Sequence, residues 1–204
     1  ITEQGLTPKT CNLRLTAIRS FLEYAAQEYL WIMPVYTDAC SVAGVKTTSR
    51  AIEYFEPPEM TALLAAPSGS SKTDRRNQMM LIFLYDTAAR VAEARQVKVS
   101  DLHLDAEVPY VTLLGKGRKY RNIPLMEKTI HHLKRYLKDF HGSDSKTDRP
   151  LFYSKAHGLV HELSSDTFEK MIKRYAAKCR ADGYPMPDHV HCHMIRKTRA
   201  MDLY

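Results

Sequence analysis

The stretch YVTLLGKGRKYRNIPL, residues 110–125, decides the fold class of this chain of 204 residues. Residues typical of β-strands lie on both sides of a centre that contains two glycines, which is the pattern of two short strands joined by a tight turn. We therefore expect a β-hairpin with its tip at residues 115–118. The other long periodic segments are helical, so the sequence predicts a mainly α protein with a small antiparallel β element, an α+β fold.

The hairpin is strongly basic. It carries four cations within six residues and no acid among them: Lys116, Arg118, Lys119 and Arg121. The two glycines let the backbone approach a partner closely, so contact with a phosphate or a DNA groove is one interpretation. The alternative is a hairpin whose lysines only prevent edge-to-edge aggregation.

Four helical segments are expected in the same unit as the hairpin, at residues 59–66, 77–96, 126–140 and 166–181. The second is apolar enough to be buried and is expected to bend near Thr87. The fourth begins at Asp166 with Glu169 three residues later, which resembles a capping box. Residues 68–77 are expected to be a polar loop, and residues 151–160 an extended segment.

A separate amphipathic helix is expected over residues 7–28, where Thr7 and Pro8 suit an N-cap and a first helical position. Its buried stripe is expected to be Cys11, Leu15, Ile18, Leu22 and Ala25. The polar run that follows is typical of a tether between two units. The expected organisation is residues 1–45, a linker at 46–50, and residues 51–204.

The composition favours a polyanionic partner. The net charge is +7 and the pI is about 9.2. The four cysteines lie at irregular spacings without a CxxC pair, so we expect neither a zinc knuckle nor a disulfide framework, and reduced thiols fit a cytoplasmic location. No apolar run approaches the length of a membrane span.

In TAARVAE, residues 87–93, Arg90 follows an apolar run and Glu93 stands one helical turn later. Desolvating an arginine is costly unless an anion or a carboxylate pairs with it. Two interpretations follow: Arg90 binds an external anion, or Arg90 and Glu93 form a structural i,i+3 pair.

The stretch HVHCHMIRKTRA, residues 189–200, also has two interpretations. On a strand, His189, His191 and His193 would share one face and suit zinc, but no acidic residue lies inside the run and there is no obvious fourth ligand. On a helix, His193 and Arg196 would point the same way and present a proton-transfer group and a phosphate-binding fork. We favour the helix and expect no metal.

Three motifs together resemble the tyrosine recombinase, or phage integrase, family. The family pattern runs Thr-Gly-x-Arg-x-x-Glu, then a hairpin with Gly-Lys-Gly and a trailing Pro-Leu, then His-x-x-Arg. Here TAARVAE, GKGRKYRNIPL and HMIRKTRA stand in the same order within residues 55–204. The stretch TPKTCNLRLTAIRSFLEYA is similar to the last long helix of the family's helical, SAM-like core-binding domain. The resemblance implies part of that domain followed by a tyrosine-recombinase-like catalytic domain.

Carried over by position, the resemblance implies catalytic roles for Arg90, Lys116, His193 and Arg196, with Glu93 supporting them. DNA contacts are expected at Arg118, Lys119, Arg121, Lys197 and Arg199. The implied partner is double-stranded DNA, bound by protomers that form a tetramer on paired sites and are monomeric when free. The implied chemistry uses a 3′-phosphotyrosine intermediate and needs no cofactor.

The chain departs from the family pattern at three places. Ala88 replaces the glycine of the first motif, and Lys197 stands where many relatives have a histidine or an arginine. The family's tyrosine lies several helical turns beyond His-x-x-Arg, and Tyr204 is too close along the helix to take that role. We therefore expect the nucleophile to lie outside this C-terminally truncated chain, which is then inactive alone.

The expected function is site-specific DNA recombination or integration, by a bacterial, phage or mobile-element protein that works in the cytoplasm at the nucleoid. One alternative is a catalytically inactive DNA-binding module of the same fold. A less favoured alternative is a metal-dependent hydrolase that uses His189, His191 and His193.

Overall fold

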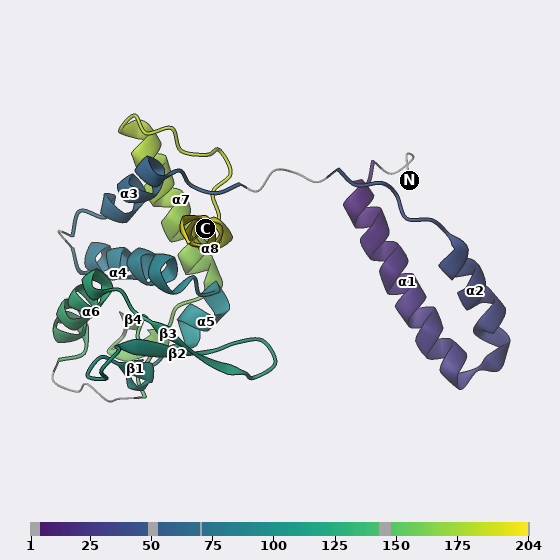
Figure 1. Ribbon diagram of the computed structural model, residues 1–204, viewed down its shortest axis with the longest axis horizontal. Helices are drawn as coiled ribbons and strands as arrows, with labels where there is room; N and C mark the ends of the chain where they lie inside the picture. Colours follow the sequence, from purple (N-terminus) through teal and green to yellow (C-terminus); the bar gives the residue numbers. More distant parts are fainter. Residues whose placement is uncertain (1–4, 49–52, 70, 143–147, 204) are drawn as a thin grey trace. The chain divides into compact units, whose positions relative to one another are not determined.

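The computed structural model describes residues 5–48, 53–69, 71–142 and 148–203. The chain divides into two compact units, Ile1–Ala51 and Ile52–Tyr204. Helices dominate both units, and two small antiparallel sheets lie in the second, so the predicted α+β class is confirmed (Figure 1). No helix in the described part is both long and apolar enough to cross a lipid bilayer.

The N-terminal unit is a pair of helices, α1 (Pro8–Glu28) and α2 (Met33–Ser41), joined by the 3-10 turn η1 (Leu30–Ile32). The predicted start of α1 is confirmed, because the hydroxyl of Thr7 accepts a hydrogen bond from the amide of Thr10 at 3.2 Å. Asn12 ties the segment after α2 to α1 through two hydrogen bonds with the backbone of Val45, at 2.9 and 2.8 Å.

The predicted buried stripe of α1 is only partly buried. Cys11, Leu15, Leu22 and Ala25 are half-buried, and Ile18 is 53% exposed, so the prediction is wrong for Ile18. The physical reason is that one short helix cannot cover a long one. Further large apolar side chains of this unit are exposed: Leu13, Phe21, Tyr24, Leu30 and Trp31.

Residues 43–48 have neither helix nor strand, and the last two positions of the predicted linker, 49 and 50, lie outside the described residues.

The second unit begins with the helices α3 (Pro57–Ala65), α4 (Lys72–Thr87) and α5 (Val91–Gln96). The helix predicted over 77–96 bends where expected and is in fact two helices. α4 also extends into the predicted polar loop, because Ser71 caps it by accepting a hydrogen bond from the Asp74 amide at 3.0 Å. Ser71 is therefore the N-cap signal of α4 within the segment predicted to be a loop.

The predicted hairpin is confirmed as β2 (Tyr110–Leu114) and β3 (Tyr120–Pro124), which follow η2 (Val99–Asp101) and β1 (Leu102–His103). The antiparallel order is β1-β2-β3, and Leu113 lies opposite Arg121. The hairpin extends well beyond the three-stranded part of the sheet (Figure 1). Its position is fixed at its base, where Val111 and Leu113 are fully buried.

The segment expected to be extended forms a second hairpin, β4 (Tyr153–Ala156) and β5 (Leu159–Glu162). Its turn has positive φ angles at His157 and Gly158, 50° and 78°. The sequence prediction included one β element and missed this one, because only Gly158 marks the turn.

The remaining helices are α6 (Glu127–Phe140), α7 (Ser165–Ala181) and α8 (Cys192–Asp202). The predicted capping box of α7 is wrong. Ser164 is the N-cap and accepts from the Thr167 amide at 3.2 Å. Glu169 instead accepts a hydrogen bond of 3.2 Å from the amide of Cys192, at the start of α8. Glu169, which is predicted to cap α7, thus helps to position α8.

Aromatic side chains join the layers of the core. Phe152 meets the ring of Phe83 from α4 and the ring of Phe168 from α7 edge-on, with centroids 5.5 and 6.4 Å apart. Met194 and Ile195 of α8 are fully buried in the same core. Burial of these side chains fixes the direction of the polar residues on the opposite face of α8.

The hydroxyl of Thr198 connects the beginning of the second unit to its last helix. It accepts from the Phe55 amide at 2.9 Å and donates to the Met194 carbonyl at 3.0 Å. Thr198 is 1% exposed, so both hydrogen bonds are protected from water.

Candidate active site

Arg90 lies in the turn between α4 and α5. The hydroxyl of Thr87 donates to the Phe83 carbonyl at 2.6 Å and accepts from the Ala89 amide at 3.3 Å. Ala88 then adopts a left-handed conformation, with φ 47° and ψ 31°, and Arg90 becomes the N-cap of α5. A residue with a Cβ adopts this conformation at a cost, which is why glycine suits the position.

Glu93 is buried under this turn and holds Arg90 in two ways. Its side chain is 4% exposed. Oε2 accepts from the Arg90 amide at 2.8 Å and Oε1 accepts from Arg90 Nη1 at 3.0 Å. The structural i,i+3 pair is therefore present. Half of the Arg90 side chain, 51%, nevertheless remains exposed, so the pair does not prevent Arg90 from binding an external anion.

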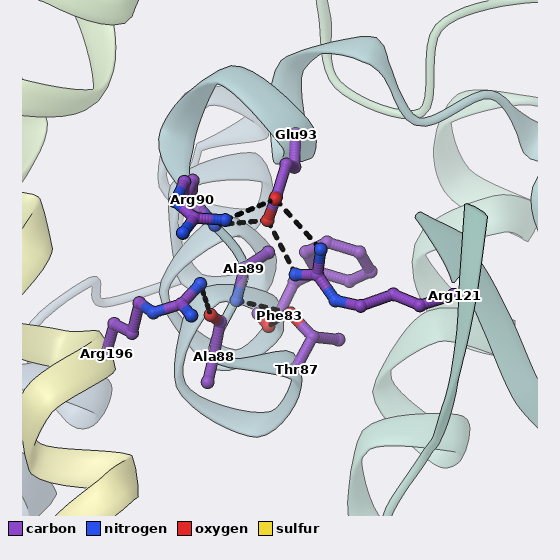
Figure 2. A network of polar contacts seen from close by, with 8 residues as sticks. All are labelled: Phe83, Thr87, Ala88, Ala89, Arg90, Glu93, Arg121 and Arg196. Atoms are coloured by element: carbon purple, nitrogen blue, oxygen red, sulfur yellow. Dashed lines mark hydrogen bonds and ion pairs between the residues drawn. The ribbon is translucent and has the colours of Figure 1, made fainter. Parts of the chain in front are cut away.

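The same carboxylate binds Arg121 from the hairpin. Arg121 Nη1 donates to Oε1 at 2.9 Å and Nη2 donates to Oε2 at 2.7 Å (Figure 2). Burial would raise the pKa of Glu93, but the hydrogen bonds from Arg121 and Arg90 outweigh it and lower the pKa to about 2. Arg121, whose side chain is 36% exposed, is thus paired with a carboxylate of the protein, whereas the sequence predicts that it contacts DNA.

Arg196 reaches the turn from α8. Its Nη1 donates to the carbonyl of Ala88 at 2.9 Å. Burial, followed by the nearby charge of Arg90, lowers the pKa of Arg196, although a guanidinium stays charged at physiological pH. The structure therefore brings together Arg90 and Arg196, two catalytic candidates that are far apart in the sequence (Figure 2).

His193 lies one turn before Arg196 on α8 and is exposed. Partial burial of the imidazole, followed by the positive charge of Lys197, lowers the pKa of His193. Arg196 and Arg90 lower it further, which shows that His193 shares their electrostatic environment. The imidazole is consequently neutral near pH 7 and is able to accept a proton.

The histidine cluster does not form the strand that a zinc site requires. His191 is the N-cap of α8, and its ring stacks on that of His193 with centroids 6.4 Å apart. His189 is exposed in the preceding loop. Within the described ranges, no group of three or more His, Cys, Asp or Glu side chains is arranged to hold a metal ion.

Lys116 stands at the hairpin tip with Arg118 and Lys119, and all three side chains are exposed. Gly117 and Arg118 have positive φ angles of 75° and 58°, and the turn closes with a hydrogen bond of 2.8 Å from the Gly115 amide to the Lys119 carbonyl. The described residues offer Lys116 no hydrogen bond or ion pair, so its ammonium group is free for a ligand.

The other two expected DNA contacts differ from each other. Lys197 is half-buried on α8 next to Arg196. Arg199 turns inward: its Nη2 lies 3.9 Å from Asp86 Oδ1, and its guanidinium lies 5.6 Å from the ring centre of Tyr85. The side chain of Arg199 is 19% exposed, so we expect it to stabilise the fold rather than to contact DNA.

Three features of the site were missed from the sequence: the Ala88 carbonyl, the attachment of Arg121 to Glu93, and the close packing over Gly115. A Cβ on Gly115 would lie 2.9 Å from Arg121 Nη1. The sequence signal for this packing is Gly115 itself, although a glycine at a hairpin tip is equally typical of a close approach to a partner.

The chain is similar to known proteins over most of its length. The phage integrase family matches residues 53–204 of the chain. The tyrosine recombinase XerD of Halalkalibacterium halodurans is 31% identical over 195 residues, which are 94% of this chain and 62% of that protein. The chain spans between 52% and 62% of the length of the first curated relatives it matches.

Two groups of solved structures share the fold. The Tn1549 transposon integrase in complex with circular intermediate DNA superimposes with a TM-score of 0.69 at 19% identity, covering 99% of this chain and 68% of that one. The site-specific recombinase XerH bound to a palindromic difH substrate gives a TM-score of 0.64 at 21% identity, covering 93% and 61%.

Proposed function

This chain belongs to the phage integrase family, and we propose that it supplies most of the active site of a tyrosine-type site-specific DNA recombinase. The proposed reaction breaks and rejoins DNA strands through a 3′-phosphotyrosine intermediate. The observation that carries the proposal is the convergence of Arg90 and Arg196 on the turn at Ala88.

The two arginines suit a phosphodiester under attack. The phosphorus becomes pentavalent and its non-bridging oxygens gain negative charge, so guanidinium groups that are already in place stabilise this state more than the ground state. Arg90 uses Nη1 for Glu93 and leaves the rest of its guanidinium exposed. Arg196 uses Nη1 for the Ala88 carbonyl, which leaves its other nitrogens for the same phosphate.

Two proton transfers complete the proposed cleavage. The tyrosine oxygen bonds to phosphorus and its proton passes to neutral His193, while the bond from phosphorus to the 5′ oxygen breaks and that oxygen takes a proton from Lys116. The phosphotyrosine keeps the energy of the broken ester bond, so the step needs neither ATP nor a metal. We assign the nucleophilic tyrosine to no residue of this chain.

The proposed partner is double-stranded DNA. Its phosphates would contact the exposed cations at the hairpin tip and Lys197 on α8. The similar XerH and Tn1549 structures are complexes with DNA, which supports this partner. We also propose that protomers assemble as a tetramer on paired sites, that the free chain is monomeric, and that the protein acts in the cytoplasm at the nucleoid.

Covalent trapping of DNA tests the proposal. The assay uses the full-length protein and a duplex selected by binding from a random pool. Arg90→Ala and Arg196→Ala should each slow formation of the covalent adduct by at least about 100-fold, with duplex affinity changed by less than about threefold. Arg75→Ala is the control, because Arg75 is half-buried like Arg196 and pairs with a carboxylate as Arg90 does, binding Asp139 at 3.4 Å.

The alternatives predict different results. If the unaltered protein binds the duplex tightly but forms no adduct, the chain is a DNA-binding module of this fold. If DNA breakage needs a divalent metal and is lost in a His189→Ala, His191→Ala variant, the hydrolase hypothesis replaces the recombinase proposal.

A further inference from the structure

We propose that Arg121 is a positioning residue for cleavage: through Glu93, it holds the hairpin that carries Lys116 against the turn that carries Arg90. This inference rests on the proposed function, in which Lys116 protonates the departing 5′ oxygen. Arg121 itself touches neither the phosphate nor the reacting atoms in this arrangement.

One carboxylate connects the two parts. Each oxygen of Glu93 accepts one hydrogen bond from β3 and one from the residue at the start of α5. Oε1 binds Arg121 Nη1 at 2.9 Å and Arg90 Nη1 at 3.0 Å. Oε2 binds Arg121 Nη2 at 2.7 Å and the Arg90 amide at 2.8 Å. The carboxylate therefore has no remaining capacity for water, and its geometry depends on both arginines.

The fork of Arg121 lies directly over the backbone next to Lys116. A Cβ on Gly115 would approach Arg121 Nη1 to 2.9 Å, the Lys119 carbonyl to 3.3 Å and Glu93 Oε1 to 3.6 Å. The residue that precedes Lys116 is thus packed against the ion pair with no room for a side chain. The hairpin is therefore held at Gly115, where this contact occurs, while Lys116, Arg118 and Lys119 at its tip are exposed.

No other ion pair within the described ranges connects the hairpin to α5. A bidentate guanidinium fixes both distance and orientation, whereas a single ammonium fixes distance alone. Arg121→Lys therefore keeps the positive charge that offsets Glu93 but removes the orienting fork. This variant therefore tests the effect of the hairpin's position while the charge of the site stays the same.

The chemistry of the leaving group gives a selective readout. In the proposed step the bond between phosphorus and the 5′ oxygen breaks, and Lys116 supplies the proton to that oxygen. When sulfur replaces the bridging 5′ oxygen, the departing thiolate needs no proton, because a thiol is far more acidic than an alcohol. A defect that acts through Lys116 disappears on the sulfur substrate, and a defect in the arginines or in folding does not.

Single-turnover cleavage of paired oxygen and sulfur duplexes by the full-length protein tests the inference. Arg121→Lys should slow cleavage of the oxygen duplex by at least about tenfold and leave the sulfur duplex within about threefold of the unaltered rate. Lys116→Ala should show the same selectivity with a larger loss. The double variant should be no slower than Lys116→Ala, because both changes affect one proton transfer.

Two further variants test whether the defect comes from the position of the hairpin and not from a change of charge or from the loss of any arginine that pairs with a carboxylate. Gly115→Ala presses on the fork without changing any charge and should reproduce the oxygen-selective defect. Arg75→Lys is the control, since the side chain of Arg75 is 35% exposed and that of Arg121 is 36%, and both bind a carboxylate. It should cleave both duplexes at the unaltered rate.

The inference is overturned if Arg121→Lys slows both duplexes equally, or if it slows neither. In both cases the recombinase proposal stands, because the unaltered protein still cleaves. If the unaltered protein cleaves neither duplex although it binds them, the proposed function fails and the inference fails with it.

Discussion

Arg196 donates a hydrogen bond of 2.9 Å to the carbonyl oxygen of Ala88, which lies 108 positions earlier in the chain. The left-handed conformation of Ala88 allows α4 to end and the chain to turn into α5 within three residues. The same short turn therefore has Arg90 at its end, and Arg196 binds the carbonyl at its start. The spacing of the two guanidiniums depends on the conformation of one alanine.

Ala88→Gly should raise the free energy of unfolding by about 0.5 to 1 kcal/mol. Glycine removes the steric cost of the left-handed backbone, and its larger entropy in the unfolded chain offsets part of the gain. Urea denaturation measures the change. Ala92→Gly, at an exposed position inside α5, is the control and should instead lower stability by a similar amount. Equal losses in both variants would contradict the role assigned to the turn.

Arg118→Gln and Lys119→Gln should each reduce the slope of log binding constant against log salt concentration by about 0.9, because each removes one proposed contact with a DNA phosphate. Titration of a labelled duplex at several salt concentrations gives the slope. Arg199→Gln removes the same charge from a side chain that already pairs with Asp86, and its slope should remain unchanged. A reduced slope for Arg199→Gln would restore it to the DNA contacts.

Glu93 should contribute to acid stability in a defined pH range. Its pKa falls from 4.5 to about 2 on folding, so the ionised carboxylate stabilises the fold above pH 4.5, and this contribution is lost as the pH falls towards 2. The contribution is about 3 kcal/mol. Urea denaturation between pH 6 and pH 2.5 should show a flatter pH dependence for Glu93→Gln than for the unaltered protein. An identical pH dependence in Glu93→Gln and the unaltered protein would contradict this contribution.

The rate of cleavage should have an acidic limb set by His193. Its pKa lies below 6.5, so the neutral imidazole persists at pH 6.5 and the rate should fall only at lower pH, where protonation removes the proton acceptor. A pH–rate profile under single-turnover conditions measures this limb. His193→Gln should lower the rate and abolish the limb, whereas His161→Gln on exposed β5 should change neither. An identical limb in His193→Gln would assign the titration to another group.

The sequence was sufficient for elements whose signals are local. The N-cap of α1, the periodicity of α6, the break at the end of α4 and the hairpin of β2 and β3 all depend on neighbouring residues, and they were found. The pairing of Glu93 with Arg121 was not, because it joins α5 to β3, a strand that begins only after three further elements, η2, β1 and β2. The same holds for Glu169, which has the spacing of a local cap but binds the amide of Cys192. Spacing along the chain does not show whether a carboxylate binds a group of its own helix or a group of a distant element.

Thr198→Val should lower the free energy of unfolding by about 1 to 3 kcal/mol, because it leaves the buried amide of Phe55 without an acceptor. Thermal and urea denaturation measure the loss. Thr198→Ser keeps the hydroxyl and removes one methyl group, so it should lose markedly less. If the two variants are equally destabilised, packing of the methyl group and not the hydrogen bond stabilises this contact.

The bond between Phe55 and Thr198 also has a mechanical consequence. Thr198 lies two residues after Arg196 on the same helix. Phe55 lies just before α3, in the segment by which the chain enters the second unit. Tension on that entering segment is applied to α8, at a point half a turn from Arg196. The incoming chain is therefore attached both to the core, through the buried ring of Phe55, and to the helix that carries His193 and Arg196.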